Sequence, residues 1–412
     1  MTLDLPTLII SRRARQVGSD WNNARSWFGG RPELGDQPWP RGAKQTPLYF
    51  LAQIDLEEVA RSRSEIELSD GALAFFLGRG EDEGTVVHVP RAQLGEPTEP
   101  PTDAPAVFNP QGDIFPEMFS EEAPRAFPRW PVDITAEAQP VTQRQFNFSA
   151  RDLYKTLDGV PRLVRWHSAQ YYAACLRRAL EAMPANIAKR LRDLQMARER
   201  LDRLRPTGFS GMLSALKVRS NLPNPEIKKL EDEIARREAS VAEIEKPAAE
   251  FELFVQGLSD YVGAMGQWEV MSPEAVEALA ATFERGKKEF RELTRFYTPH
   301  EFADLETETL LALATADDET YATMPEAIRT LINTQYLLPT RSCGWHQMFG
   351  TGVEIQGNAA AENEGNLMLL QLVYDDMMHW RFGDNGAYQF WISPEDLRHG
   401  NWAAAHVTFE CH

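Results

Sequence analysis

Hydrophobic runs near both ends of the chain predict β-strands. The segment "TPLYFLAQIDL" (46–56) is a nearly continuous apolar run, which is typical of a strand that is buried on both faces. The segment "GALAFFLGRGEDEGTVVHV" (71–89) indicates two strands joined by an acidic, Gly-rich turn. After residue 338 the chain returns to apolar runs separated by tight turns. These patterns predict mainly antiparallel β structure at each end of the chain.

The two ends also resemble each other in sequence. Leu51-Ala52-Gln53-Ile54 matches Leu369-Leu370-Gln371-Leu372, and the segment 70–76 (DGALAFF) matches 385–391 (NGAYQFW). The order and the spacing of the two matching pieces are similar at both ends. We infer an internal duplication of a strand-turn-strand unit, with helices inserted between the copies.

The middle of the chain has the periodicity of helices. Two heptad patterns run through it, one at Ile187, Leu191, Leu194, Arg198 and Leu201, the other at Ile227, Leu230, Ile234, Arg237, Val241 and Ile244. Antiparallel pairing brings both seams into register without slippage, so the sequence predicts an antiparallel helical hairpin. Further helices are expected to begin at Ser272-Pro273 and Thr298-Pro299, where a capping side chain precedes proline.

The tip of this predicted hairpin, "PTGFSGMLSALKVRSNLPNP" (206–225), is apolar and locally basic. Clustered apolar surface at the end of an arm is typical of a partner contact. The candidate contact residues are Phe209, Met212, Leu213, Leu216, Lys217 and Arg219. In the alternative reading, these residues fold back to cap the hairpin or dock on the body of the protein.

The sequence therefore predicts an α+β fold in three parts. Residues 1–160 form a first β unit with a Pro-rich surface loop, and residues 339–412 form a second β unit that packs with the first. Residues 161–338 form a helical insertion that includes the hairpin arm, at about 184–246. A chain of 412 residues is long enough for more than one core.

Charge and composition narrow the classes of partner. The chain has 43 Lys and Arg against 61 Asp and Glu, a net charge of −18, which argues against binding to nucleic acid. We expect no membrane span and a cytoplasmic location, because the N-terminal region does not have the organisation of a signal peptide. Three cysteines are too few for a disulfide framework and fit a reducing compartment.

Several residues are candidates for chemistry. Gln53 and Gln371 lie inside apolar runs, where an unpaired amide would cost about 1–3 kcal/mol, so each needs hydrogen-bond partners. They either satisfy the backbone or line a ligand cleft between the two β units, and the cleft candidates are Arg31, Trp39, Gln53, His346, Gln371 and Trp380. The structural role is favoured, because burial alone requires those bonds.

Two other groups are weaker candidates. Cys343, His346 and Cys411 have zinc-ligand chemistry, but paired Cys-x-x-Cys motifs are missing, so no metal is predicted. The acids Asp375, Asp376 and Asp384 lie near His379 in sequence and suggest acid-base or cation chemistry, with a solvated loop as the favoured reading. No catalytic motif is recognised and no cofactor is predicted.

Both ends resemble the YwqG-like family, also known as the domain of unknown function 1963. The matching motifs are Gly29-Gly30-Arg31-Pro32, Trp39-Pro40, 50–56 (FLAQIDL) and 71–76 (GALAFF), then His346, Gly350, Gln356, 369–372, 386–392 and Asp396-Leu397. The family has no established reaction. Its members are bacterial, and some are encoded near secreted toxins, so the resemblance implies a role in interaction or immunity. The long helical segment departs from shorter family members.

Together these observations favour a non-enzymatic, cytoplasmic protein-binding module of the immunity, antitoxin or adaptor type. An acidic protein of this kind would meet a basic partner, such as a toxin, because opposite charge accelerates the encounter. The alternative is a small-ligand-binding protein or enzyme that uses the cleft between the two β units.

Overall fold

The computed structural model describes residues 5, 7–19, 21, 23–62, 68, 70–78, 83–107, 125–136, 165–204, 225–295, 297–335, 345–357, 359–378, 380 and 382–412. The chain divides into two compact units. The first, here called the β body, comprises residues 1–162 and 306–412. The second, here called the helical unit, comprises residues 163–305. The fold is α+β, with a mainly antiparallel sheet and a helical insertion.

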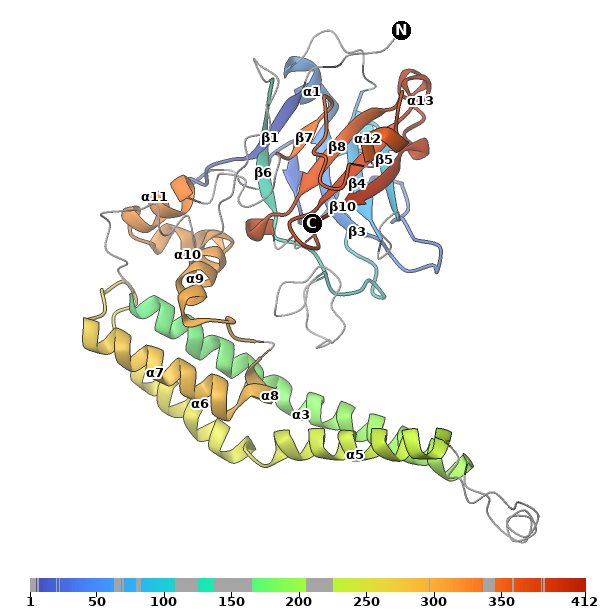
Figure 1. Ribbon diagram of the computed structural model, residues 1–412. Helices are drawn as coiled ribbons and strands as arrows, with labels where there is room; N and C mark the ends of the chain where they lie inside the picture. Colours follow the sequence, from blue (N-terminus) through green and yellow to red (C-terminus); the bar gives the residue numbers. More distant parts are fainter. Residues whose placement is uncertain are drawn as a thin grey trace, which may run out of the picture. The chain divides into compact units, whose positions relative to one another are not determined.

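The β body is built on one ten-stranded sheet of order β10-β9-β8-β7-β1-β6-β2-β3-β4-β5 (Figure 1). Its strands are β1 (Leu8–Arg12), β2 (Trp27–Phe28), β3 (Tyr49–Asp55), β4 (Ala72–Leu77), β5 (Gly84–Val89), β6 (Trp130–Ala136), β7 (Gln347–Met348), β8 (Leu367–Val373), β9 (Ala387–Ile392) and β10 (His406–Glu410). Every recorded pairing between these strands is antiparallel. The strands predicted at 46–56 and 71–89 are confirmed as β3, β4 and β5.

The sheet is nearly closed into a barrel. A Cβ atom added at Gly84 on β5 would lie 2.9 Å from Val407 Cγ1 on β10, so the two edge strands approach each other. Inside, the ring centroids of Phe75 on β4 and Phe390 on β9 are 5.2 Å apart. Every residue of β3, β4 and β9 is buried. This explains why these strands are continuous apolar runs and do not alternate with polar residues.

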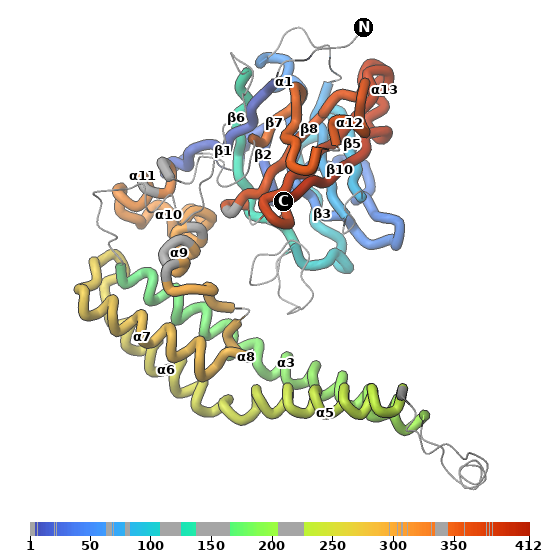
Figure 2. The backbone as a smooth tube through the Cα atoms, in the orientation of Figure 1, coloured from blue at the N-terminus to red at the C-terminus, as the bar shows by residue number. Residues whose placement is uncertain are grey.

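The strand order places two four-stranded meanders on either side of a central pair, β1 and β6. The first meander is β2–β5 and the second is β7–β10. Figure 2 shows how the chain path brings β7, from late in the sequence, beside the N-terminal strand β1, where Leu8 faces Met348 and Ile9 faces Gln347. The sheet therefore joins the two ends of the chain.

The two meanders have matching registers. Gln53 faces Trp27 and Ala74 in the first meander, and Gln371 faces Gln347 and Gln389 in the second. Each long central pair is interrupted once, between Phe50 and Ala52 and between Met368 and Leu370. Equivalent points of the two meanders therefore have the same backbone pairing.

The turns that follow β2 and β7 also agree. Gly29 and Gly30 have φ of +57° and +66°, and Phe349 and Gly350 have φ of +56° and +69°. A positive φ strains a residue that has a Cβ atom, which explains why three of these four positions are glycine. The Gly29-Gly30 pair is a turn into the segment that leads to β3.

Helices complete the β body at several points. They are α1 (Leu56–Ser62), α9 (Leu305–Ala314), α10 (Asp318–Thr323), α11 (Glu326–Gln335), α12 (Ala359–Glu362) and α13 (Pro394–His399), with short 3-10 turns at Arg91–Gln93, Asp376–Met378 and Trp402–Ala404. Arg15 holds the α9–α11 region, because its guanidinium donates to the carbonyl oxygens of Ala314 (3.0 Å) and Ala316 (2.6 Å). These helices therefore belong to the β body, whereas the sequence grouped them with the insertion.

The helical unit contains α3 (Trp166–Leu204), α5 (Pro225–Glu245), α6 (Ala248–Gly263), α7 (Pro273–Glu289) and α8 (Arg291–Thr294), followed by a 3-10 turn at Phe302–Asp304. Ser272 caps α7 by accepting a hydrogen bond from the Ala275 amide, as predicted. The predicted start at Thr298-Pro299 is wrong, because the cap is Glu301 and the element is the 3-10 turn. Among the described residues, each helix is too short or too polar to cross a bilayer.

The second half of α3 contacts α5. Arg198 pairs with Glu238 at 2.6 Å, and Arg190 donates to the Ser240 carbonyl oxygen at 3.0 Å. Leu194, Leu201, Leu230, Val241 and Ile244 are buried, while Leu191 on the predicted seam is 43% exposed. The connection between the two helices (205–224) lies outside the described residues, so the hairpin stays a prediction.

Candidate functional site

A buried polar group of the β body joins three distant segments. Arg12 ends β1, His346 precedes β7, and Asp375 follows β8. The side chains of these three residues are 1%, 3% and 0% exposed. Arg12 lies on the inner face because side chains alternate along a strand, and Leu8 and Ile10 of the same strand are buried. We call Arg12, His346 and Asp375 the buried charge cluster.

Asp375 is the centre of the buried charge cluster. Its Oδ2 forms an ion pair with Arg12 Nη1 and lies 2.9 Å from His346 Nε2. Its Oδ1 accepts a hydrogen bond from the Met377 amide at 2.9 Å. The carboxylate therefore has partners on both oxygens, as a buried charge requires.

His346 is held in one tautomer. Its Nδ1 accepts a hydrogen bond from the Val373 amide at 3.2 Å, so the ring proton is on Nε2 and is donated to Asp375. Burial, and then the nearby Arg12 charge, hold the pKa of His346 well below its usual value of 6.5. His346 is therefore neutral near pH 7, and its role is that of a hydrogen-bond donor to the carboxylate.

Aromatic rings enclose the imidazole. Phe28 and Trp380 lie with ring centroids 4.9 Å and 5.6 Å from His346, and Phe382 stacks on Trp380 at 5.7 Å. This enclosure explains the strong effect of burial on the imidazole. The buried charge cluster connects the ends of neighbouring strands by an ion pair and hydrogen bonds inside the β body. A solute could reach this cluster only if the β body opened.

The first meander has a buried carboxylate of its own, Asp55, in more open surroundings. Asp55 is 1% exposed, and its Oδ2 accepts from Arg25 Nε (3.1 Å) and Arg91 Nη1 (2.5 Å). Its Oδ1 accepts from the Glu57 and Glu58 amides that begin α1. The side chains of Arg25 and Arg91 are 35% and 31% exposed, so water reaches them. We call Arg25, Asp55 and Arg91 the surface arginine cluster.

Glu57 extends this cluster to the surface. Hydrogen bonds from Arg25 and then from Arg61 lower the pKa of Glu57 to about 2. The same bond with Glu57 raises the pKa of Arg25, and the bond with Asp55 raises the pKa of Arg91. Arginine and carboxylate side chains alternate along this network, so each charge is neutralised by a neighbour of opposite sign.

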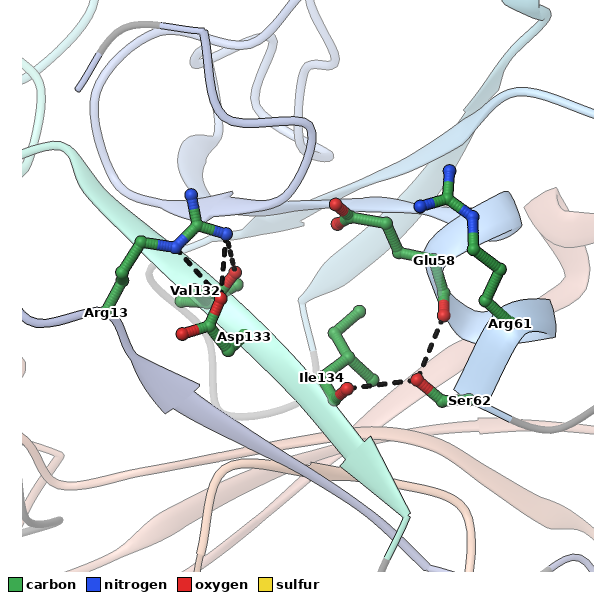
Figure 3. A pocket seen from close by; sticks show the side chains of 7 residues that line it. All are labelled: Arg13, Glu58, Arg61, Ser62, Val132, Asp133 and Ile134. Atoms are coloured by element: carbon green, nitrogen blue, oxygen red, sulfur yellow. Dashed lines mark hydrogen bonds and ion pairs between the residues drawn. The ribbon is translucent and has the colours of Figure 1, made fainter. Parts of the chain in front are cut away.

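A small pocket lies between α1 and β6 (Figure 3). Its volume is about 200 Å³, and the lining residues are Arg13, Glu58, Arg61, Ser62, Val132, Asp133 and Ile134. Figure 3 shows Arg13 and Arg61 on opposite sides of the pocket. Arg13 pairs with Asp133 at 2.7 Å, and Ser62 Oγ donates to the Ile134 carbonyl at 3.0 Å. The pocket is polar, and much of its lining is already hydrogen-bonded.

The two glutamines predicted as cleft residues occupy equivalent positions in the two meanders. Gln53 Oε1 accepts from the Glu33 amide at 2.8 Å, and Gln371 Oε1 accepts from the Val353 amide at 2.7 Å. Gln371 also donates to the Trp345 carbonyl at 2.9 Å and accepts from Gln389 Nε2 at 3.0 Å. Each amide fixes the segment that follows β2 or β7 in its own meander, and the recorded bonds do not join the two amides.

The other predicted cleft residues are dispersed. Arg31 forms an exposed ion pair with Glu99 at 2.6 Å. Trp39 packs against Phe76 and donates from Nε1 to the Leu48 carbonyl at 2.9 Å. Only His346 and Trp380 lie together, in the aromatic enclosure described above.

The weak metal candidates are not assembled in the described residues. His346 is bonded to Asp375, and Cys411 lies near Gly383, while Cys343 lies outside the described residues. The described part of the chain holds no cluster of three or more metal-ligating side chains. The partner-contact candidates at 209–219 and His379 also fall outside it.

Sequence reasoning named His346 and Asp375 as candidates, but it missed Arg12 and all three members of the surface arginine cluster. Asp375 was expected in a solvated loop, and this is wrong, because Asp375 is 0% exposed. Arg12 could have been found, since it continues the alternation of Leu8 and Ile10. The partners of Asp55 could not, because Arg25 and Arg91 are far from it in sequence and only the fold brings them together.

A comparison with known protein families identifies the family of this chain. A family model described as "Domain of unknown function (DUF1963)" matches residues 26–108 and 231–411. The chain belongs to this family. The match leaves 109–230 as a central insertion, and it extends into the helices from 231 onward. A search of curated proteins found no match.

Proposed function

We propose that the chain is a non-enzymatic protein-binding module of the bacterial cytoplasm, of the immunity, antitoxin or adaptor type. It would meet a basic partner, such as a toxin, through an arm formed by the later part of α3 together with α5. This arm is residues 184–246, the range expected for the helical hairpin. Its tip would carry Phe209, Met212, Leu213, Leu216, Lys217 and Arg219.

The observation that carries this proposal is the contrast within α3. Its first part is packed into the core of the helical unit, where Trp166, Ala169, Tyr172, Leu176 and Ala179 are all buried. After Pro184 the buried residues of α3 are Leu194, Ala197 and Leu201. A helix that buries only a narrow seam against one neighbour leaves most of its surface available to another molecule.

The exposed surface of the arm has contact chemistry. Leu191 is 43% and Met196 is 59% exposed, so apolar side chains reach the surface on a helix that is otherwise polar. The described residues of the arm, 184–204 and 225–246, contain eleven basic and ten acidic side chains, so the arm carries charges of both signs. Apolar groups between charged ones are typical of protein interfaces.

The bonding of the predicted cleft residues supports the non-enzymatic reading. Gln53, Gln371 and His346 each make hydrogen bonds to their own surroundings. A catalytic group needs a free donor or acceptor within reach of a substrate. These bonds are those of groups that hold the β body together.

The matching registers of the two meanders support the inferred duplication. The paired residues, the interruptions at Leu51 and Leu369, and the positive φ angles after β2 and β7 all correspond. Two unrelated meanders would share some of these features, but the set as a whole favours descent from one strand-turn-strand unit.

The test is capture of the natural partner by a tagged full-length chain. In the test variant a flexible linker replaces residues 206–226. We expect the variant to lose the partner while its circular dichroism spectrum and its melting temperature stay close to those of the parent chain. Photo-crosslinking from position 196 should label the same partner. Unchanged capture by the linker variant would contradict the proposal.

A matched control separates the arm from the cleft. Arg31→Ala removes a cleft candidate that lies in an exposed ion pair, where such pairs contribute about 0–1 kcal/mol. If the arm carries binding, Arg31→Ala captures the partner as the parent chain does.

The alternative function is small-ligand binding, and the pocket between α1 and β6 is the observation that favours it. A ligand at this pocket would contact Arg13 and Arg61. A compound that raises the melting temperature of the parent chain, but not that of an Arg13→Ala, Arg61→Ala variant, would favour this alternative.

A further inference from the structure

Three buried glutamines form a row across the second meander. Gln347 on β7 faces Gln371 on β8, and Gln371 faces Gln389 on β9. The row lies on the outer face of the sheet, because side chains alternate along a strand and the next residue, Phe390, packs against Phe75 inside the β body. The three glutamines are 0–4% exposed. We call them the glutamine row.

Residues 351–357, here called the strap, cover the glutamine row. Side chains from four successive strands bind backbone groups of the strap at every second residue. The bonds are Gln347 Nε2 to the Thr351 carbonyl oxygen (3.0 Å), the Val353 amide to Gln371 Oε1 (2.7 Å), Gln389 Nε2 to the Val353 carbonyl oxygen (2.7 Å) and the Ile355 amide to Glu410 Oε2 (2.6 Å). A spacing of two residues is that of an extended chain. The row and Glu410 therefore bind the backbone of an extended segment.

The strap approaches the row most closely at Gly352. A Cβ atom added there would lie 2.6 Å from Gln389 Nε2 and 2.7 Å from Met368 Sδ, so a larger residue does not fit. The next residue, Val353, is buried in a small apolar cluster with Val373. A segment that fits this site therefore carries glycine followed by a small apolar residue.

The equivalent segment of the first meander, 31–37, is held more firmly. The Glu33 and Val353 amides donate to the equivalent glutamines, which aligns the two segments. Leu34 in the first segment is 0% exposed, whereas Glu354, at the corresponding position of the strap, is exposed. Val353 is the one buried side chain of the strap. A segment with few buried apolar contacts opens at a lower free energy than the sheet beneath it.

We propose that the strap opens while the sheet stays folded, and that the glutamine row then binds an extended segment of another polypeptide in its place. The strap itself shows which chemistry fits, namely backbone amide and carbonyl groups at alternate residues, as in other modes of peptide recognition. Gln389 Oε1 is buried and has no hydrogen-bond partner among the described residues, so the row retains an acceptor that the strap does not use. This site is separate from the arm and does not rest on the function proposed for it.

The first experiment measures amide hydrogen exchange of the full chain by mass spectrometry at single-residue resolution. We expect the Val353 and Ile355 amides to exchange at one common rate, about tenfold or more faster than the Glu33 amide, because the strap lacks a buried leucine. Val353→Ser should raise the Ile355 rate about tenfold again, and the matched change of an exposed neighbour, Glu354→Ser, should leave it unchanged. An Ile355 amide that exchanges as slowly as the Glu33 amide would overturn the proposal.

The second experiment tests the binding of a peptide to the parent chain, so it does not depend on the folding of a variant. A synthetic peptide of residues 351–357 (TGVEIQG) with blocked ends, added in large excess, should compete with the strap and raise the exchange rates of Val353 and Ile355 several-fold. The same peptide carrying Gly352→Val should have no effect, because the row leaves no space for its side chain. No acceleration by the first peptide, or equal acceleration by both, would rule out this site.

Discussion

The two meanders of the β body have the same backbone registers but hold their buried carboxylates in opposite ways. Asp55 of the first meander is bonded to Arg25 and Arg91, whose side chains are about one-third exposed. Asp375, which follows β8 in the second meander, is bonded to Arg12 and His346, which are almost fully buried. The same strand arrangement therefore supports one charge network open to water and one closed to it.

This difference teaches that backbone register does not fix the electrostatic surroundings. Around Asp55, water can solvate an arginine that loses its carboxylate. Around Asp375, aromatic rings enclose the cluster, so each charge depends on its partner. Removing one member of a buried pair costs much more than removing one member of an exposed pair. The predictions below test this contrast.

The largest effect is expected from Asp375→Asn. It leaves the buried Arg12 charge without its carboxylate, and breaking such a pair costs about 3–5 kcal/mol of unfolding free energy. The matched change Asp55→Asn should cost less, because Arg25 and Arg91 remain partly hydrated. Urea unfolding of both variants measures the difference. Equal losses, or a larger loss for Asp55→Asn, would show that the second meander is not the closed one.

A smaller difference is expected between the equivalent glutamines. Gln371→Ala removes a hydrogen bond from the backbone amide of Val353, the carbonyl of Trp345 and the side-chain amide of Gln389. Gln53→Ala removes the hydrogen bond that the backbone amide of Glu33 donates. Each buried group left unpaired costs about 1–3 kcal/mol. We expect Gln371→Ala to lower the urea midpoint more than Gln53→Ala. The opposite order would contradict the roles given to these amides.

The third effect is the pH dependence of stability from His346. Its pKa is lowered in the folded chain, so below about pH 6.5 the unfolded chain binds a proton that the folded chain does not. The free energy of unfolding is therefore unaffected by this group above pH 6.5. As the pH falls from 6.5 toward the pKa of folded His346, the free energy of unfolding decreases by up to about 1.4 kcal/mol per pH unit.

His346→Gln keeps a donor and an acceptor but does not titrate, so its curve of unfolding free energy against pH should be flatter between pH 6.5 and 5. Burial lowers the pKa of His167 in the helical unit to about 4, so His167→Gln should remove a separate contribution. Parallel curves for His346→Gln and the parent chain would mean that His346 binds protons equally in the folded and unfolded states, which contradicts a lowered pKa in the folded chain.

Much of the fold follows from local patterns. Strands β3, β4 and β5 were predicted because their apolar runs are continuous and the turn chemistry between them is strong. The start of α7 was predicted from Ser272-Pro273, and the structure confirms it. The two-residue strands β2 and β7 were not predicted, because such short pairs have no hydrophobic period and form only where neighbouring strands place them.

The candidate site was predicted less well. Gln53 and Gln371 were selected as polar residues that burial forces to find partners, and both are buried and hydrogen-bonded. The identity of the partners was not predictable, since Arg12 and Asp375 are separated by most of the chain. The arm and the duplication stay proposals, each with contacts that support it.

The sequence by itself determined the long buried strands β3, β4 and β5, the helical middle of the chain, the family that the chain resembles, and the need of Gln53 and Gln371 for hydrogen-bond partners. These features depend on propensity, period and desolvation, all of which act over a few residues. Only the tertiary structure decided that helices α9–α11 join the β body, that the sheet nearly closes, and that Asp375 is buried while Asp55 is reached by exposed arginines. Those outcomes depend on contacts between residues that are separated by 30 to about 300 positions or more, which no local pattern specifies.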